Sequence, residues 1–245
     1  MDTRLSRLLM VLILGPIFAS GCIVIELDGC AAKAVRGSGN VVSEDRPVPE
    51  FNQISLKGSG NVFLTKGAKP ALVIKTDDNI LPLIEAGVRS AKLVISQRKN
   101  VRPTTLDFFI TVTDLNGVAI SGSGNVTGES RFVADKFDAQ ISGSGDIALD
   151  LEVAKLQSGI AGSGSLTLGG QADYHEASIT GSGAINAFEM KAKKVFVSIT
   201  GSGDCKVNAS EALQANITGS GDVYYMGHPQ IDSTIKGSGS LKSQK

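Results

Sequence analysis

Large aromatic side chains are scarce in this chain of 245 residues, which has no tryptophan and only 5% aromatic residues. A compact β-sandwich normally fills its centre with several large rings, so a thin core of small aliphatic side chains is the better expectation. Glycine, in contrast, is abundant at 29 residues. Since glycine has no side chain, this composition favours a fold in which neighbouring backbones approach closely.

An excess of charge of either sign is also absent, because 24 basic residues balance 24 acidic ones. Nucleic-acid-binding proteins normally show a basic excess or a basic stripe, and this chain has neither. No polybasic run is present that would attract the chain to anionic lipid. We therefore expect no nucleic-acid partner and no purely electrostatic attachment to a membrane.

Motifs that carry catalytic or metal chemistry are missing as well. The sequence lacks the serine-hydrolase elbow, the phosphate loop and the zinc-ligand pattern. The two histidines, His175 and His228, have no Cys, Asp or second His at metal-ligand spacing, and we interpret them as surface or turn residues. We accordingly expect no enzyme activity, no metal and no bound cofactor other than a covalent lipid.

The N-terminal segment has the pattern of an export signal. Arg4 and Arg7 precede an apolar stretch at residues 8–18, which is too short to span a bilayer as a helix. The segment at residues 18–22, Phe-Ala-Ser-Gly-Cys, resembles the bacterial lipobox, whose cysteine receives a diacylglyceryl group before cleavage. We therefore predict a lipoprotein signal peptide at residues 1–21 and lipid attachment at Cys22, since the alternative, Cys30, follows a poorly fitting Asp28.

This assignment divides the chain into the signal peptide, an anchor and linker at residues 22–33, and one body at residues 34–245. The residue after the anchor is Ile23, not Asp, and by analogy with lipoprotein sorting in Gram-negative bacteria this favours the outer membrane. We expect a cell-envelope protein that is held on the membrane by lipid. The sequence leaves open whether the body faces the periplasm or the cell surface.

A Gly-Ser-Gly motif recurs along the body and is its main structural signal. Successive copies are 18 to 21 residues apart, except for one interval of 64 residues. Repeats at a fixed period of this length are typical of stacked structural units. The nine copies begin at Gly37, Gly58, Gly122, Gly143, Gly162, Gly181, Gly201, Gly219 and Gly237.

Apolar residues occupy fixed positions on both sides of the motif and alternate with polar residues, which is the periodicity of a strand with one inward face. The position two residues before the motif holds Val35, Leu56, Ile120, Ile141, Ile160, Ile179, Ile199, Ile217 and Ile235. The position four residues after its first glycine holds Val41, Val62, Val126, Ile147, Leu166, Ile185, Cys205, Val223 and Leu241. Each unit is therefore predicted as a strand, a glycine corner and a second strand.

A period of 18 to 21 residues fits one coil of a parallel β-helix, because a propeller blade is about twice as long. If the long interval holds three coils, the body has about eleven coils and is about 50 Å long. The middle of the chain, residues 68–117, departs from the pattern. There we expect strands near residues 71–75, 91–96 and 105–113, and either a short helical turn or a loop at residues 78–83.

Asp204 and Asp222 follow two successive corners and are expected to lie about 5 Å apart on adjacent coils. Two such carboxylates could recruit a cation or serve a polysaccharide-cleaving β-helix enzyme, but solvated turn residues are the preferred interpretation. In three other copies, Ser165, Ala184 and Ser240 take this position, which argues against a column of calcium ions. The question of a cation at Asp204 and Asp222 stays open.

The remaining cysteines are not expected to form a bridge. Cys205 lies at an inward position of a coil, and Cys30 lies before the first coil. In a rod the two would be about 38 Å apart, far beyond the reach of a disulfide.

Specific segments of the chain resemble the bacterial family of auto-transporter adhesin head domains called the head GIN domain. The similarity runs over about residues 48–240 and includes residues 51–62, the Asp-Asp-Asn-Ile-Leu segment at residues 77–81, and residues 92–95 and 118–124. The resemblance implies a right-handed β-helical body in the cell envelope. It implies no binding residues.

Three functions are consistent with these observations. The first is a non-enzymatic, adhesin-like or scaffold module that binds an envelope protein or glycan through flat β faces. The second is a polysaccharide-active enzyme on a β-helix. The third is a purely structural spacer that forms homo-oligomers, because the end coils of a β-helix leave strand edges unpaired.

Overall fold

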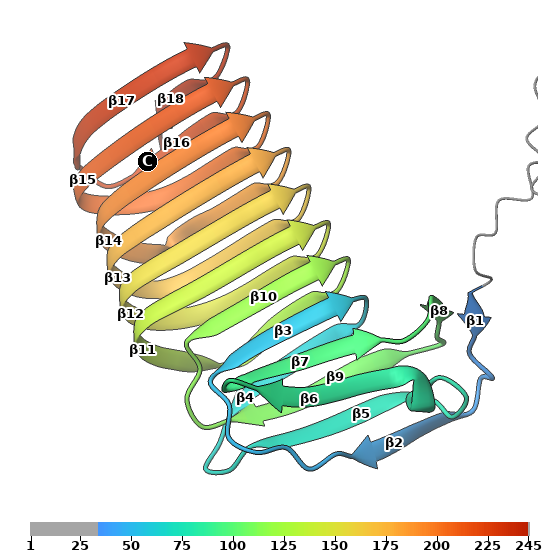
Figure 1. The fold of residues 1–245 in the computed structure, drawn as a ribbon. Coiled ribbons are helices and arrows are strands. Elements are labelled where there is room, and N and C mark those ends of the chain that lie inside the picture. Colours follow the sequence, from blue (N-terminus) through green and yellow to red (C-terminus); the bar gives the residue numbers. More distant parts are fainter. Residues whose placement is uncertain (1–33, 245) are drawn as a thin grey trace, which may run out of the picture. The chain divides into compact units, whose positions relative to one another are not determined.

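The computed structural model describes residues 34–244, which are almost entirely β-structure (Figure 1). A single short 3-10 helix, η1 (Leu81–Leu83), occurs in this part of the chain. The strands are β1 (Val35–Arg36), β2 (Val41–Asp45), β3 (Gln53–Gly58), β4 (Asn61–Lys66), β5 (Ala71–Asp77), β6 (Ile84–Arg89), β7 (Lys92–Gln97), β8 (Val101–Arg102), β9 (Leu106–Val112), β10 (Gly117–Gly122), β11 (Asn125–Gly143), β12 (Asp146–Gly162), β13 (Ser165–Gly181), β14 (Ala184–Gly201), β15 (Asp204–Gly219), β16 (Asp222–Met226), β17 (Gln230–Gly237) and β18 (Ser240–Ser243).

The C-terminal part winds as a β-solenoid of about seven turns, in which β11 to β15 each pair in parallel with the next strand (Figure 1). These long strands follow most of a coil, from one Gly-Ser-Gly corner to the next. The predicted parallel β-helix with a coil of 18 to 21 residues is therefore confirmed.

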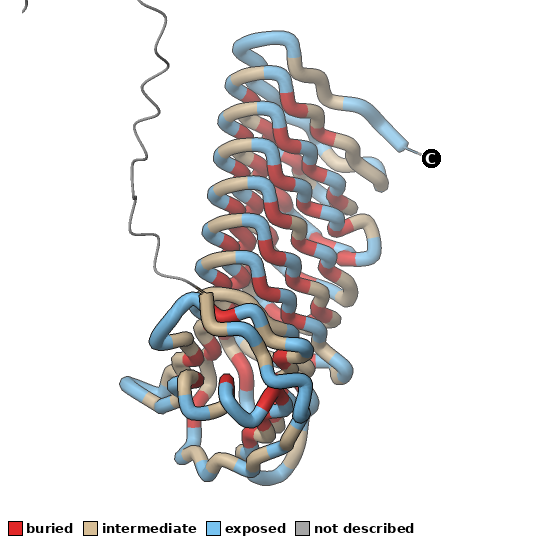
Figure 2. Tube along the Cα trace, turned by 90° about the vertical axis from the view of Figure 1, so that its right-hand side faces the viewer, coloured by how far each residue is buried: buried red, intermediate tan, exposed pale blue. Residues whose placement is uncertain are grey.

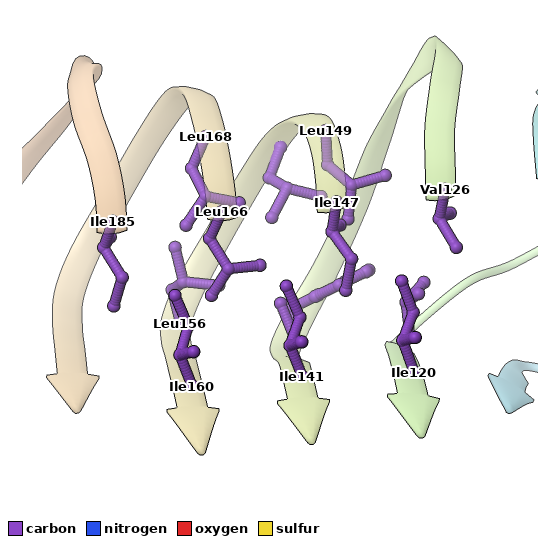
Figure 3. Close-up of a cluster of buried hydrophobic side chains, with 14 of the residues drawn as sticks. Ile120, Val126, Ile141, Ile147, Leu149, Leu156, Ile160, Leu166, Leu168 and Ile185 are labelled. Atoms are coloured by element: carbon purple, nitrogen blue, oxygen red, sulfur yellow. The ribbon is translucent and has the colours of Figure 1, made fainter. Parts of the chain in front are cut away.

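The apolar positions beside the motif form the interior of the solenoid, and Figure 3 shows part of it. Ile141 lies opposite Ile160, and Ile160 lies opposite Ile179. The buried members of the column before the corner are Leu56, Ile120, Ile141, Ile160, Ile179, Ile199 and Ile217. Those of the column after it are Val62, Val126, Ile147, Leu166, Ile185, Cys205 and Val223. The predicted stacking of equivalent side chains is confirmed for these coils.

Each corner needs glycine because it lies directly on the corner of the preceding coil. Gly143 has a φ of +131°, and a Cβ atom there would lie 2.3 Å from the carbonyl oxygen of Gly122. A Cβ atom on Gly145 would lie equally close to the carbonyl oxygen of Gly124. The backbone N–H of Ser144 donates to the Gly122 carbonyl at 2.9 Å. The motif thus permits hydrogen bonding between corners where any side chain would prevent contact.

A further inward column lies on the same strands, four residues before the column that precedes the corner. It begins with Phe137, which is opposite Leu156, and continues through His175 and Val195 to Leu213. All five side chains are buried. The column therefore contains one polar side chain among four apolar ones.

The long interval between Gly58 and Gly122 is not a stack of three coils, and the expected total of about eleven coils is wrong. β10 pairs directly with β3, so that Gly122 lies opposite Gly58. The intervening chain builds a base below this coil: β7 and β9 add one parallel layer, and β6 and β5 pair with them antiparallel. The length of the interval did not reveal this, because the same number of residues can form three coils or the antiparallel strands that cover one end of the solenoid.

The strands predicted within residues 68–117 are confirmed as β5, β7 and β9, and of the two alternatives at residues 78–83 the helical turn is present, as η1. The first copy of the motif, however, is not a solenoid corner. β1 pairs with β8, and β2 pairs antiparallel with β5. Val41, expected in an inward column, is 37% exposed. The regular pattern breaks here because the segment is attached to the base and not to another coil.

The C-terminal end of β5 holds the first copy of the Gly-Ser-Gly motif in place. Asp77 is fully buried and accepts hydrogen bonds from the backbone N–H groups of Gly39, at 2.8 Å, and Thr104, at 2.7 Å. Burial alone would raise the pKa of Asp77, but these N–H groups hold it below its usual value. Ser38 donates a hydroxyl hydrogen bond to Asp78. The Asp-Asp-Asn segment at residues 77–79 is therefore a clamp for the incoming chain.

Candidate functional site

The predicted lipid-attachment residue, Cys22, and the predicted signal peptide lie outside the described residues. Among the residues that the structure describes, no helix is long and apolar enough to cross a membrane. The described chain enters the body at the base, beside β1, and leaves it at the opposite end, beside β18 (Figure 1).

Asp204 and Asp222 lie on adjacent coils, as their spacing predicted, but one oxygen of Asp204 and both oxygens of Asp222 already have partners. Asp204 Oδ1 accepts the backbone N–H of Asp222 at 3.0 Å. Lys242 Nζ donates to Asp222 Oδ2 at 2.7 Å, and Ser240 Oγ donates to Oδ1 at 2.6 Å. These donors hold the pKa of Asp222 at about 2, with Lys242 contributing most. The arrangement is a hydrogen-bonded ion pair at the surface.

Over residues 34–244, no three acidic, His or Cys side chains come close enough together to hold a metal ion. Asp222, paired with Lys242 and with a lowered pKa, is also unsuited to the role of general acid that cleavage of a glycosidic bond requires. Tyr224, which is near the pair, donates its hydroxyl to Asp222 at 3.2 Å. The donors of this cluster therefore satisfy the hydrogen-bonding capacity of the Asp222 carboxylate.

His175 is not a surface or turn residue, so that prediction was wrong for this residue, whereas His228 is indeed exposed. His175 is 1% exposed, and its Nε2 shares a hydrogen bond of 2.8 Å with Ser158 Oγ. Burial lowers the pKa of His175 to about 4, so the ring is neutral near pH 7. Alternation along β13 places His175 inward, between Leu156 and Val195, where no substrate reaches it.

Cys205 is a buried free thiol, as its inward position predicted. Burial, with a smaller contribution from Asp204, raises its pKa to about 12. A thiol of this kind is neither a nucleophile nor a metal ligand near neutral pH. The prediction that Cys205 forms no disulfide with Cys30 stays untested, because Cys30 lies outside the described residues.

A flat outward face extends along the sheet that leads into the corners. We call it the serine–threonine face, and on β10 to β15 it consists of Ala119, Ser121, Gln140, Ser142, Gly159, Ala161, Ser178, Thr180, Ser198, Thr200, Asn216 and Thr218. These side chains are small, and none is charged. The face contains a shallow hollow of about 360 Å³ around Gly159. It offers hydroxyl and amide groups at the regular spacing of the strands.

A second hollow, of about 640 Å³, lies at the base and has a basic lining. Arg46, Lys57, Arg89 and Arg98 surround it together with a single carboxylate, Glu85. Arg98 pairs with Glu85 at 2.6 Å and contributes most to keeping the pKa of Glu85 below its usual value. No sequence pattern predicted this hollow, because its cations come from separate segments of the irregular part of the chain.

Two phenylalanines stack on the outward face of the opposite sheet. The ring centroids of Phe63 on β4 and Phe109 on β9 are 5.2 Å apart, with an interplanar angle of 16°. Each ring therefore covers one face of the other, while Phe109 stays 42% exposed. The pair is a cross-strand contact that stabilises the junction of the base with the first coil.

The chain matches the family model of the putative auto-transporter adhesin, head GIN domain, over residues 50–229. A crystal structure of a putative adhesin from Bacteroides fragilis is similar over 86% of this chain and 100% of its own, with 32% identity and a TM-score of 0.82. A putative lipid binding protein from Parabacteroides distasonis shares the fold at 24% identity, with a TM-score of 0.74 over 87% of this chain and all of its own.

A putative adhesin from Parabacteroides merdae also has this fold, with 22% identity, a TM-score of 0.68, and coverage of 87% of this chain and all of its own. No curated protein matches the chain. The family match lies within the range that the repeat and the Asp-Asp-Asn segment had indicated. The chain therefore belongs to the putative auto-transporter adhesin, head GIN domain family.

Proposed function

We propose that this protein is a non-enzymatic envelope module, anchored by lipid on Cys22, that binds an envelope glycan or protein through the serine–threonine face. The observation that carries the proposal is the uncharged character of this face over six consecutive strands: β12 contributes Gly159 and Ala161, and each of the other five strands presents at least one polar side chain on the flat surface. Such a surface can lie along an extended partner and form many weak hydrogen bonds without a deep pocket.

The adhesin-like names of the family and of its solved relatives agree with a binding role. The basic hollow at the base favours a second candidate, which is binding of an acidic group. Arg46 pairs with Glu44 and Arg98 with Glu85, so Lys57 and Arg89 give the hollow its net positive charge. A hollow of this size is within the range of small-ligand sites. Competition experiments distinguish the two surfaces: an acidic polysaccharide should displace a partner bound at the basic hollow, and a neutral one should displace a partner bound at the serine–threonine face.

A binding assay on envelope fractions tests the proposal. Ala161 lies in the middle of the serine–threonine face, and Ala161→Arg introduces a bulky charge there. Thr167→Arg is the matched control, because Thr167 is equally exposed but lies on the opposite sheet, beyond the corner. We expect Ala161→Arg to lose retention on the fraction that binds the unaltered protein, while Thr167→Arg keeps it. Equal retention of the two variants would exclude this face.

The enzyme alternative has a separate assay, which is the release of reducing ends from acidic polysaccharides. We expect no release, because Asp222 is paired with Lys242 and has a pKa of about 2, which prevents it from acting as a general acid. Turnover that disappears in Asp204→Ala or Asp222→Ala would instead establish an enzyme.

A further inference from the structure

The C-terminal end of the solenoid, which we call the tip, presents a strand with one free edge. β17 pairs with β15, and the described chain places no strand on its other side. All eight residues of β17 are exposed, and Figure 2 shows the tip without the buried positions found in the coils below it. Such an edge is a template for pairing with another chain.

The hydrogen bonds between β15 and β17 identify the backbone groups that are free. The N–H of Ser238 donates to the carbonyl of Gly219, and Gly219 lies opposite Gly237. In a parallel ladder, the residues on either side of such a partner point toward the neighbouring strand, and alternate residues point away. Ile231, Ser233 and Ile235 therefore direct their N–H and C=O groups away from β15.

The same three residues lie above the inward columns, so the tip also leaves the core uncovered. Ile231 is 41% exposed and Ile235 is 40% exposed, whereas their partners on β15, Leu213 and Ile217, are each 1% exposed. The base, in contrast, is covered by antiparallel strands. β17 contains no proline and no inward charge, so the side of the strand that lies above the core has no protection; its two charges, Asp232 and Lys236, lie on the outward side.

We infer that the tip is a docking surface for the tip of a second copy of this protein, with the two β17 strands antiparallel about a two-fold axis at Ser233. In this register Ile231 of each copy lies opposite Ile235 of the other, and all the free N–H and C=O groups of these residues become paired. The outward residues Asp232 and Lys236 of the two copies then lie diagonally across the junction, with opposite charges. β17 is thus complementary to itself in hydrogen bonding, apolar contact and charge.

This inference rests on the proposed envelope function and specifies one of its partners. The described chain enters at the base and the free edge is at the tip (Figure 1). If lipid on Cys22 holds the protein at its N-terminal end, copies on two facing membranes meet by their tips. The contact involves one strand from each copy and is small, so it gains strength from many copies acting together.

Disulfide trapping tests the register on the fragment 33–245, which is one compact unit containing the whole described core. The fragment lacks Cys22 and Cys30, and its remaining thiol, Cys205, is buried. Opposed residues of a hydrogen-bonded antiparallel pair have Cα atoms about 5.5 Å apart, within disulfide range. We expect Ser233→Cys to form a covalent dimer under mild oxidation, several-fold more than the control Thr234→Cys, which does not face itself in this register.

Sedimentation of the unaltered fragment should show a reversible dimer that Ile235→Lys abolishes, because this variant places two charges in the apolar junction. A fragment that stays monomeric at every concentration, together with equal trapping at positions 233 and 234, would overturn the inference. Predominant trapping at position 234 would also overturn it in favour of another register. Envelope retention blocked by Ala161→Arg does not depend on the tip, so the two proposals can fail separately.

Discussion

At the scale of single residues, His175 shows how a coil position can hold a polar group inside an apolar column. The ring occupies the place of a leucine or valine in the neighbouring coils and has one hydrogen-bond partner, Ser158, which is buried too. The position is stable only while the ring is neutral, because a buried imidazolium would lack a compensating charge.

This burial predicts a dependence of stability on pH. Between pH 6.5 and about pH 4 the unfolded chain binds a proton at His175 and the folded protein does not, so stability falls as the pH falls. At about pH 5 this loss amounts to about 2 kcal/mol relative to neutral pH. We expect urea denaturation of Ser158→Ala/His175→Leu to lack this part of the acid sensitivity.

The matched control is His228→Leu, because His228 is exposed. It should keep the acid sensitivity of the unaltered protein. Identical pH profiles for all three proteins would contradict the neutral, buried state of His175.

At the scale of structural elements, the corners and the clamp perform different tasks with the same Gly-Ser-Gly motif. In the solenoid the glycines allow backbone to contact backbone. In the first copy, Gly37 makes room for Asp77, whose carboxylate would be 2.2 Å from a Cβ atom at that position. The motif therefore occurs in two environments, and in both a glycine makes room for a close neighbour.

The corner predicts a large difference between neighbouring substitutions. Gly143→Ala should destabilise the protein by about 2 kcal/mol or more, because alanine is strained at this φ and its Cβ meets the Gly122 carbonyl. Ser144→Ala, one residue away and exposed, should change stability by less than about 0.5 kcal/mol. Chemical denaturation measures both, and similar values for the two variants would refute the role of the corner.

The clamp predicts a local effect at the base. Asp77→Asn removes the charge that accepts the N–H groups of Gly39 and Thr104 and should loosen the segment before β3 while the solenoid stays folded. Limited proteolysis should then cut between residues 34 and 50 faster than in the unaltered protein. Asp45→Asn is a suitable control, because Asp45 is exposed on β2; equal cleavage rates would argue against the clamp.

At the scale of the whole molecule, the body has a covered base and an uncovered tip. Because of this polarity, a lipid anchor before residue 34 would hold the protein at its base and leave the tip free to bind. We expect Cys22→Ser to lose incorporation of labelled palmitate and to leave the membrane fraction. Palmitate that remains on Cys22→Ser but disappears in Cys30→Ser would move the anchor to Cys30.

Protease treatment of intact cells extends this test to the orientation of the body. A tip that meets a second cell must lie outside the cell, so the protein should be degraded in intact cells as fully as in broken ones. Protection in intact cells would restrict the proposed binding to periplasmic partners.

Much of the fold could be predicted because the coils are local and repetitive. Ile160 and Ile179 stack as expected since each coil needs only the same alternation of residues as the coil beside it. The strand order of the base could not be predicted from this repeat. Strand β6 turns back on β7 through Ser90 and Ala91, both with positive φ, and nothing in the spacing of the motifs reveals this reversal.

The sequence by itself determined the unit of the structure: strand alternation decides which side chains face inward, and glycine decides where one backbone can rest on another. Only the tertiary structure decided the order of the layers at the base, the burial of His175, the basic hollow and the free edge of β17. These features depend on which distant strands pair, and a strand of given pattern can pair in parallel or antiparallel with similar local preferences. Contacts across long intervals in the chain therefore select among arrangements that the local pattern leaves equivalent.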